Sequence, residues 1–204
     1  MLAYLFWHAP LPDVDPRQYE TALLEFLSDL SGSPPAGFGS CTTFRISEVP
    51  WLNKQPRYED WYFVRSSADL DALNEAAVKP SRCDVHAAVA SKMGVGHGGL
   101  YQHLLGHEQP HDGGRAAWLT RPRGIRYQDP LEKIIEESDG LLSCWRRQMV
   151  LGPADEFVVV GTSQLRISAP QGWRMQTVER TTLAPPSLNS KVTALISHQQ
   201  RCCL

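Results

Sequence analysis

The sequence predicts an α+β fold in which two tandem βαββ(α)β units close an antiparallel barrel with their helices outside. Three observations support this prediction. Strand-like runs closed by proline occur twice, an Asp-Pro pair follows each of them, and a Gly-to-Ser-Cys run recurs at the same offset. Self-similarity of this kind is typical of repeated structural units.

The opening elements of the two units match. Residues 3–10 (AYLFWHAP) resemble residues 116–122 (AAWLTRP), since both are apolar runs that end in proline. Asp15-Pro16 and Asp129-Pro130 follow, and each predicts a helix start because Asp is a favoured N-cap and Pro is favoured at the first helical position. Apolar residues at helical spacing come next: Tyr19, Leu23, Phe26, Leu27 and Leu30 in the first unit, and Leu131, Ile134 and Ile135 in the second.

The middle strands match as well. Residues 37–46 resemble residues 140–149, because both begin at Gly and carry Ser-Cys at the same offset (Ser40-Cys41 and Ser143-Cys144). In residues 59–64 and 155–160 an acidic pair precedes aromatic and β-branched residues, which is typical of a buried strand. The first unit then adds helices near 69–78 and 84–93 and a strand at 99–104, whereas the second adds only a strand at 173–178.

This order divides the chain into a first unit at residues 1–109, an abbreviated second unit at 110–185 and a tail at 186–204. One unit leaves a sheet face uncovered, and two units can cover each other by closing a barrel. The chain thus resembles the dimeric α/β-barrel superfamily, whose units are ferredoxin-like, in its fused tandem-repeat form. The resemblance implies a small-molecule-binding barrel; many members are cofactor-poor monooxygenases, isomerases or lyases, and some bind haem.

Length, charge and cysteine content exclude several classes. The 204 residues carry a formal net charge of −2, so no basic excess indicates a nucleic-acid or membrane surface. No stretch approaches the roughly 20 apolar residues of a membrane helix. The five cysteines are odd in number and form no CxxC pair, which indicates a reducing compartment. We therefore expect a cytoplasmic protein with a small-molecule ligand, without nucleic-acid or membrane partners, either a monomer by internal pairing of its repeats or a homodimer.

Strand alternation predicts a pocket inside the barrel. Residues at alternate positions share a face, and pockets lined by aromatic rings with a few polar groups are the usual small-molecule sites. We therefore assign the polar-aromatic face of each strand to the interior; a packed core with polar tips is the alternative. The predicted substrate-binding residues are Tyr4, Phe6, Trp61, Trp118 and Trp145, and the residues predicted to pack under helices are Leu5, Trp7, Leu100, Leu104 and Leu119.

Four polar residues are candidates for catalysis. His8, Tyr101 and His103 could serve as acids or bases, because their side chains exchange or donate protons. Arg147 could hold an anionic group of the substrate. For His8, a strand-end histidine bonded to the backbone is the alternative.

Other motif-like runs predict no site. The acidic pairs at 59–60 and 155–156 point to opposite faces of a strand, so they are not carboxylate dyads and are interpreted as solvated strand starts. Residues 94–99 match GxGxxG but follow a helix and precede a strand, so a flexible connection is expected and not a nucleotide site.

Four histidines lie close together in the sequence: His97, His103, His107 and His111. Helix-breaking Gly and Pro separate them, so no metal site is predicted. Haem, with His103 or His8 as its ligand, stays open through the resemblance alone.

Two functions remain. The first is an enzyme acting on an apolar or aromatic metabolite without a nucleotide cofactor. The second is a non-catalytic ligand-binding or interaction protein that reuses the fold. A cavity that holds a polarised His beside Tyr or Arg would favour the enzyme, and a filled barrel interior would favour the second.

Overall fold

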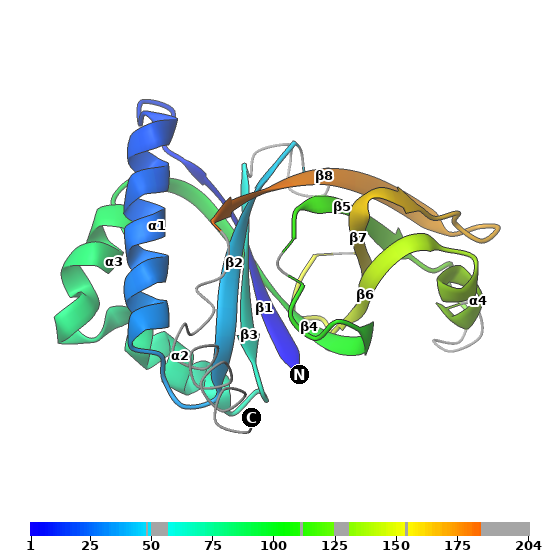
Figure 1. Cartoon of the computed structure of the whole chain (residues 1–204), viewed down its shortest axis with the longest axis horizontal. Helices are drawn as coiled ribbons and strands as arrows, with labels where there is room; N and C mark the ends of the chain where they lie inside the picture. The colour runs from blue at the N-terminus through cyan, green and yellow to red at the C-terminus, as the bar shows by residue number, and fades with distance from the viewer. Residues whose placement is uncertain (48, 50–56, 111, 125–130, 154, 185–204) are drawn as a thin grey trace, which may run out of the picture.

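The computed structural model describes residues 1–47, 49, 57–110, 112–124, 131–153 and 155–184. Eight antiparallel strands form a closed barrel in the order β1-β3-β2-β8-β5-β7-β6-β4, and β4 pairs back onto β1 (Figure 1). The strands are β1 (Leu2–Pro10), β2 (Phe38–Ile46), β3 (Tyr58–Val64), β4 (Met93–Gly106), β5 (Gly114–Thr120), β6 (Asp139–Arg147), β7 (Phe157–Arg166) and β8 (Arg174–Ala184). The α-helices are α1 (Pro16–Gly32), α2 (Asp69–Val78), α3 (Cys83–Ala90) and α4 (Leu131–Glu136), and a 3₁₀ turn, η2 (Pro80–Arg82), links α2 to α3.

The first half of the chain carries the long helices. Asp15 caps α1 by accepting a hydrogen bond from the backbone N–H of Arg17 at 2.8 Å, and Pro16 begins the helix as predicted. Figure 1 shows α1, α2 and α3 together on one side of the barrel, over β1, β2 and β3. A buried apolar layer joins them to the sheet and includes Leu23, Leu30 and Tyr62.

The second half has a thinner covering. The helix α4 is short, and the outer face of β5, β6 and β7 is buried by a smaller apolar cluster that includes Ile134 and Trp173. Asp129-Pro130 and the tail at 186–204 lie outside the described residues. The strand order maps onto itself when β1, β2, β3 and β4 are exchanged with β5, β6, β7 and β8, and the tandem repeat itself stays a prediction. The superposition of Ser40-Cys41 on Ser143-Cys144 stays a prediction, although both cysteines are buried on the second strand of their half.

The barrel interior is a packed core built around four tryptophans. Trp7 meets Trp118 edge-on at a ring-centroid distance of 5.5 Å, and Trp61 meets Trp145 in the same way at 5.5 Å. All four side chains are fully buried. An interior of this width can be filled entirely by side chains, and here large indole rings fill it.

The predicted orientation of β1 is therefore wrong. Leu5 and Trp7 face the barrel interior, whereas Tyr4, Phe6 and His8 face the helices. The physical reason is a buried acceptor: the indole N–H of Trp7 donates to Glu59 inside the barrel at 2.8 Å. On the other strands the side chains lie on the predicted sides of the barrel wall. Leu100, Leu104 and Leu119 pack outside the barrel, and Trp61, Tyr101, Trp118 and Trp145 pack inside it.

The sequence predicts a flexible connection at residues 94–99, and this prediction is also wrong. The glycine-rich run is the first part of β4 and pairs with β1. A Cβ atom at Gly96 would lie 2.5 Å from the Phe6 ring, and one at Gly98 would lie 2.5 Å from the Tyr4 hydroxyl oxygen. The glycines thus make room for the aromatic rings of β1 on the outer face of the sheet.

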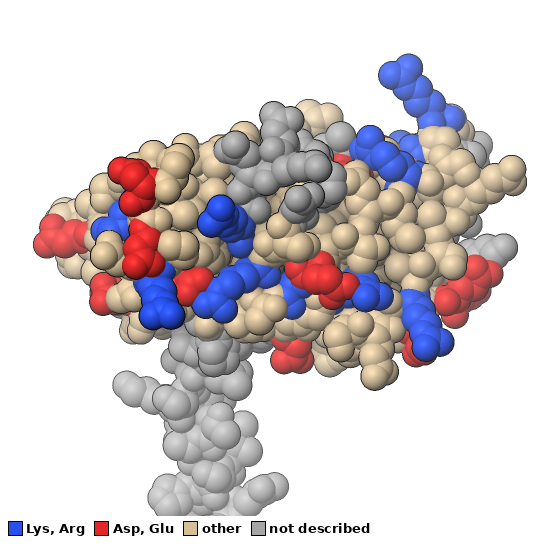
Figure 2. Space-filling view, turned by 90° about the horizontal axis from the view of Figure 1, so that it is seen from above, with Lys and Arg blue, Asp and Glu red and all other residues tan. Residues whose placement is uncertain are grey.

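The surface is of mixed charge on the face shown in Figure 2, where Lys and Arg side chains are interspersed with Asp and Glu. This agrees with the small net charge of −2. No helix within the described ranges is long and apolar enough to cross a membrane.

Candidate functional site

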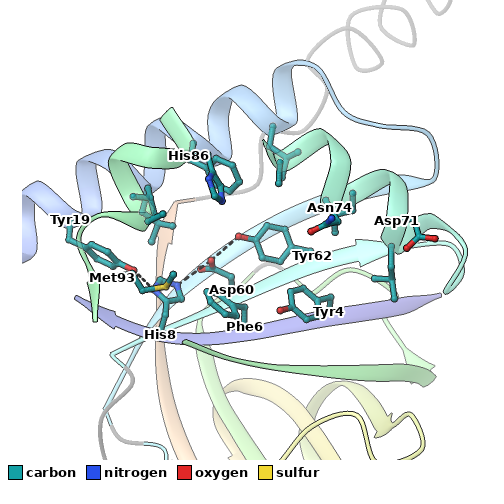
Figure 3. A pocket seen from close by; sticks show the side chains of 18 residues that line it. Tyr4, Phe6, His8, Tyr19, Asp60, Tyr62, Asp71, Asn74, His86 and Met93 are labelled. Atoms are coloured by element: carbon teal, nitrogen blue, oxygen red, sulfur yellow. Dashed lines mark hydrogen bonds and ion pairs between the residues drawn. The ribbon is translucent and has the colours of Figure 1, made fainter. Parts of the chain in front are cut away.

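A pocket of about 430 Å³ lies between the outer face of β1 and β3 and the helices α1, α2 and α3 (Figure 3). Its volume is in the range of small-molecule sites, and most of its wall is apolar. The apolar side chains come from all three helices and from the start of β4: Leu23, Phe26, Leu70, Leu73, Val89 and Met93.

His8 lies at the enclosed end of this pocket and is 1% exposed. Its Nδ1 shares a hydrogen bond with the Tyr19 hydroxyl at 2.6 Å, in which either atom can be the donor. Its Nε2 lies 3.2 Å from Oδ2 of Asp60, out of line for a hydrogen bond, so this contact is electrostatic. The ring stacks with Phe6 at 5.3 Å and with Tyr58 at 5.5 Å. The imidazole is thus fixed between a hydroxyl and a carboxylate.

Asp60 is the buried carboxylate of the site. It accepts hydrogen bonds from the Thr43 hydroxyl at 2.7 Å and from the Tyr62 hydroxyl at 2.9 Å, and it is 1% exposed. The interpretation of the two acidic pairs as solvated strand starts is wrong, because Glu59, Asp60 and Asp155 are all buried. Glu59 and Asp60 do point to opposite faces: one enters the barrel interior and the other enters the pocket.

The tyrosines around the pocket hold their protons strongly. Burial raises the pKa of Tyr19 and of Tyr62 well above the ordinary value, and the charge of Asp60 adds to both effects. The pKa of Tyr4 is raised by the same two causes. These hydroxyls therefore remain neutral hydrogen-bond donors at physiological pH.

Tyr58 gives a pH dependence that can be measured. Burial, together with a hydrogen bond to Glu20, raises its pKa to about 12, against a value near 10 in an unfolded chain. Above about pH 10 the unfolded chain releases a proton that the folded chain keeps, so stability falls as the pH rises toward 12. Burial likewise raises the pKa of the Cys41 thiol to about 11 and that of the Cys144 thiol to about 12. We therefore expect urea titrations from pH 8 to 11.5 to show a free energy of unfolding that begins to decline at about pH 9 and declines more steeply above about pH 10. Tyr58→Phe should make the decline shallower, and an unchanged slope would contradict this role.

The residues predicted to form one site lie in two places, so that prediction is wrong. Three of them, Tyr4, Phe6 and His8, line the helix-side pocket. The others belong to the barrel interior or its rim. Trp61, Trp118 and Trp145 are core residues, Tyr101 donates to the backbone oxygen of Asp155 at 3.2 Å, and His103 packs against Trp145 at 4.8 Å. Arg147 pairs across from Tyr101 and donates to the backbone oxygens of Met149 and Pro153.

Sequence reasoning missed six polar residues of the pocket, namely Tyr19, Asp60, Tyr62, Asp71, Asn74 and His86. A signal existed for Asp60, because it stands within Tyr58–Val64, a strand that is buried along its whole length. A carboxylate inside such a run must find partners. For Tyr19 the only signal was its place on the buried stripe of α1.

Haem does not fit the two histidines proposed for it. An axial ligand needs an imidazole nitrogen directed into open space. Both nitrogens of His8 face protein groups, and His103, which is half-buried, packs against the Trp145 ring and does not line the pocket. Among the described residues no three His, Cys, Asp or Glu side chains are grouped so that they could hold a metal ion.

No protein-family model and no curated protein sequence matches the chain. Among solved structures, a candidate chlorite dismutase matches with a TM-score of 0.51 and 11% identity over 89% of this chain and 95% of that one. A candidate monooxygenase from Lactobacillus acidophilus NCFM matches with a TM-score of 0.47 and 8% identity over 90% and 97%. At such low identity the first likeness shows the fold alone, which is the dimeric α/β-barrel, ferredoxin-like fold.

Proposed function

We propose that this protein is an enzyme that applies acid–base catalysis, without a nucleotide cofactor, to a small apolar or aromatic molecule bound in the helix-side pocket. One observation carries the proposal: His8 lies at the enclosed end of an apolar pocket, between the Tyr19 hydroxyl and the Asp60 carboxylate. A histidine that shares a hydrogen bond with a tyrosine hydroxyl can take part in proton transfer.

His8, Tyr19 and Asp60 could act together either to take a proton from the bound molecule or to give one to it. The Asp60 carboxylate lies 3.2 Å from Nε2 of His8, where its negative charge would face the ring when the ring takes up a proton at Nδ1. The raised pKa of Tyr19 means that its tyrosinate is not populated at rest. A proton leaving the bound molecule would therefore reach the Tyr19 oxygen as the Tyr19 proton passes to Nδ1 of His8. The reverse transfer would make the same hydroxyl an acid.

The second candidate is a non-catalytic binding protein. It is favoured by the filled barrel interior and by the burial of Tyr19, His8 and Asp60, each of which is at most 1% exposed. In that case the three residues would stabilise the sheet–helix contact and the pocket would bind without turnover.

The test uses 5-nitrobenzisoxazole, a small neutral aromatic molecule. A base removes its ring C–H proton, the C–H electrons form the nitrile bond, the N–O bond breaks, and the coloured 2-cyano-4-nitrophenolate is released. We expect saturable turnover by the wild-type chain. Ala77→Trp, which fills the pocket from α2, should abolish it, whereas Val78→Trp at the neighbouring position, 51% exposed, should not.

Two results would contradict the proposal. Turnover that persists in Ala77→Trp would place the activity outside the pocket. Absence of turnover in a wild-type chain whose pocket still binds 2-phenylethanol would support the binding protein instead.

We also propose that residues 1–109 and 110–185 are tandem units of a cytoplasmic protein, either a monomer or a homodimer. The strand order supports the repeat, because the two halves occupy corresponding places around the barrel.

A further inference from the structure

The charges around the pocket are all of one sign. Two carboxylates line it, Asp60 on β3 and Asp71 on α2, and none of the described lining residues is Lys or Arg. Asp60 is enclosed by Thr43, Tyr62 and His8. Asp71 is exposed and makes no hydrogen bond or ion pair with any described residue, so its charge is available to a ligand.

An anionic ligand is disfavoured by this arrangement. A carboxylate or phosphate that leaves water needs a countercharge, and without one the transfer is strongly unfavourable. Arg147, the residue that the sequence suggested as an anion holder, lies beside Tyr101 on the β4–β6 pair and does not line the pocket.

A cationic ligand is favoured by the same residues. Figure 3 shows Asp71 and Asn74 toward one end of the pocket and His8 toward the other, with Tyr4 and Phe6 along the floor between them. The rings of Tyr4 and Phe6 stack at 6.2 Å, which makes a continuous aromatic surface. Aromatic faces attract ammonium groups, and a carboxylate at the mouth adds a direct ion pair.

We infer that the ligand of this pocket is an amine with an aromatic or apolar body. Its ammonium group would lie at Asp71 and Asn74, and its body would extend over Tyr4 and Phe6 toward His8. This inference rests on the proposed function only in taking the pocket as the ligand site.

The experiment compares three probes of similar size by isothermal titration calorimetry: phenethylamine, 2-phenylethanol and 3-phenylpropionate, which are cationic, neutral and anionic at pH 7. We expect phenethylamine to bind about tenfold more tightly than 2-phenylethanol, as a cation–π contact and an ion pair predict, and 3-phenylpropionate to bind most weakly. Asp71→Asn should remove the advantage of the amine and leave the affinity of 2-phenylethanol unchanged. Glu75→Gln makes the same charge change at an exposed position of α2 that does not line the pocket, and it should preserve the advantage.

The possible results distinguish the inference about an amine ligand from the proposed function of the pocket. If 3-phenylpropionate binds as tightly as phenethylamine, or if Asp71→Asn keeps the advantage of the amine, the inference is overturned while the pocket remains a ligand site. If Ala77→Trp leaves the affinity of all three probes unchanged, the pocket is not their binding site, and the proposed function fails as well.

Discussion

Replacing Glu59 by Ala is expected to lower the free energy of unfolding by about 3–5 kcal/mol, the usual cost of leaving one member of a buried ion pair without its partner. Glu59 accepts hydrogen bonds from the indoles of Trp7 at 2.8 Å and Trp61 at 2.7 Å, and its Oε1 lies 3.4 Å from Nη1 of Arg180. Both charged side chains are fully buried. Burial lowers the pKa of Arg180, and Glu59 is the group that counteracts this effect. Urea titration measures the change.

Arg180 explains why the loss should be large. Its guanidinium lies over the Phe44 ring at 4.2 Å, and its Nε and Nη2 atoms have no hydrogen-bond partner among the described residues. Without Glu59 the interior would hold an uncompensated charge, and two indole N–H groups would lose their acceptor.

A surface pair provides the matched control. Glu179 pairs with Arg115 at 2.6 Å but is 57% exposed, so Glu179→Ala should cost less than about 1 kcal/mol. The double variant Glu59→Gln, Arg180→Met removes both charges and keeps an acceptor for one of the two indoles, so it should recover part of the stability lost in Glu59→Ala. A cost for Glu59→Ala as small as that for Glu179→Ala would contradict the barrel-core description.

Replacing Asp60 by Asn is expected to reduce the turnover of 5-nitrobenzisoxazole by about 10²–10⁴-fold, the range attributed to a positioned acid or base. Asparagine keeps the shape of the side chain, but its single oxygen can accept from only one of Thr43 and Tyr62, and it carries no charge beside Nε2 of His8. His8→Gln should cause a similar loss, because both residues act in the proposed transfer. Steady-state kinetics at a temperature where each variant is folded give the comparison.

Asp155→Asn is the control for this substitution. Asp155 is also buried and also accepts from a threonine, Thr120, at 2.7 Å, but it lies outside the pocket. Its replacement should leave turnover within about twofold of wild type, since it removes a comparable buried charge without touching the proton-transfer site. Equal losses in Asp60→Asn and Asp155→Asn would indicate a general effect on the fold.

The order of elements could be predicted because local signals set it. Asp15-Pro16 marks the start of α1, and the aromatic run after residue 57 marks β3; both signals depend only on neighbours in the chain. Closure of the barrel followed from the need to cover a sheet face.

The face of each strand could not be predicted in the same way. On β1 both sets of alternate residues contain an aromatic ring, so the pattern of Tyr4, Leu5, Phe6 and Trp7 is compatible with either orientation. The choice depends on Glu59, which is distant in sequence and accepts the Trp7 N–H only once β1 and β3 are paired. The pocket was misplaced for this reason, since reversing one strand moves its whole set of side chains to the other face.

The site was found in part. His8 was identified from its place after an apolar strand, but its partners come from α1 and β3, and a sequence does not show which distant residues a strand end will meet. Asp60 was set aside because a charged pair at the start of a strand is usually solvated. Here both faces of β3 are covered, one by the barrel interior and the other by the helices.

We propose that the ligand binds in the pocket under the helices and not in the interior of the barrel. The four methionines report on separate regions: Met93 lines the pocket, Met1 packs against the barrel-interior cluster, Met175 packs against the outer cluster of the second half, and Met149 is 78% exposed. NMR spectra of the chain labelled with ¹³C at the methionine methyl groups, titrated with 2-phenylethanol, therefore distinguish the two locations. We expect a saturable shift of the Met93 signal alone, which disappears in Ala77→Trp. A shift of the Met1 or Met175 signal with Met93 unchanged would contradict it.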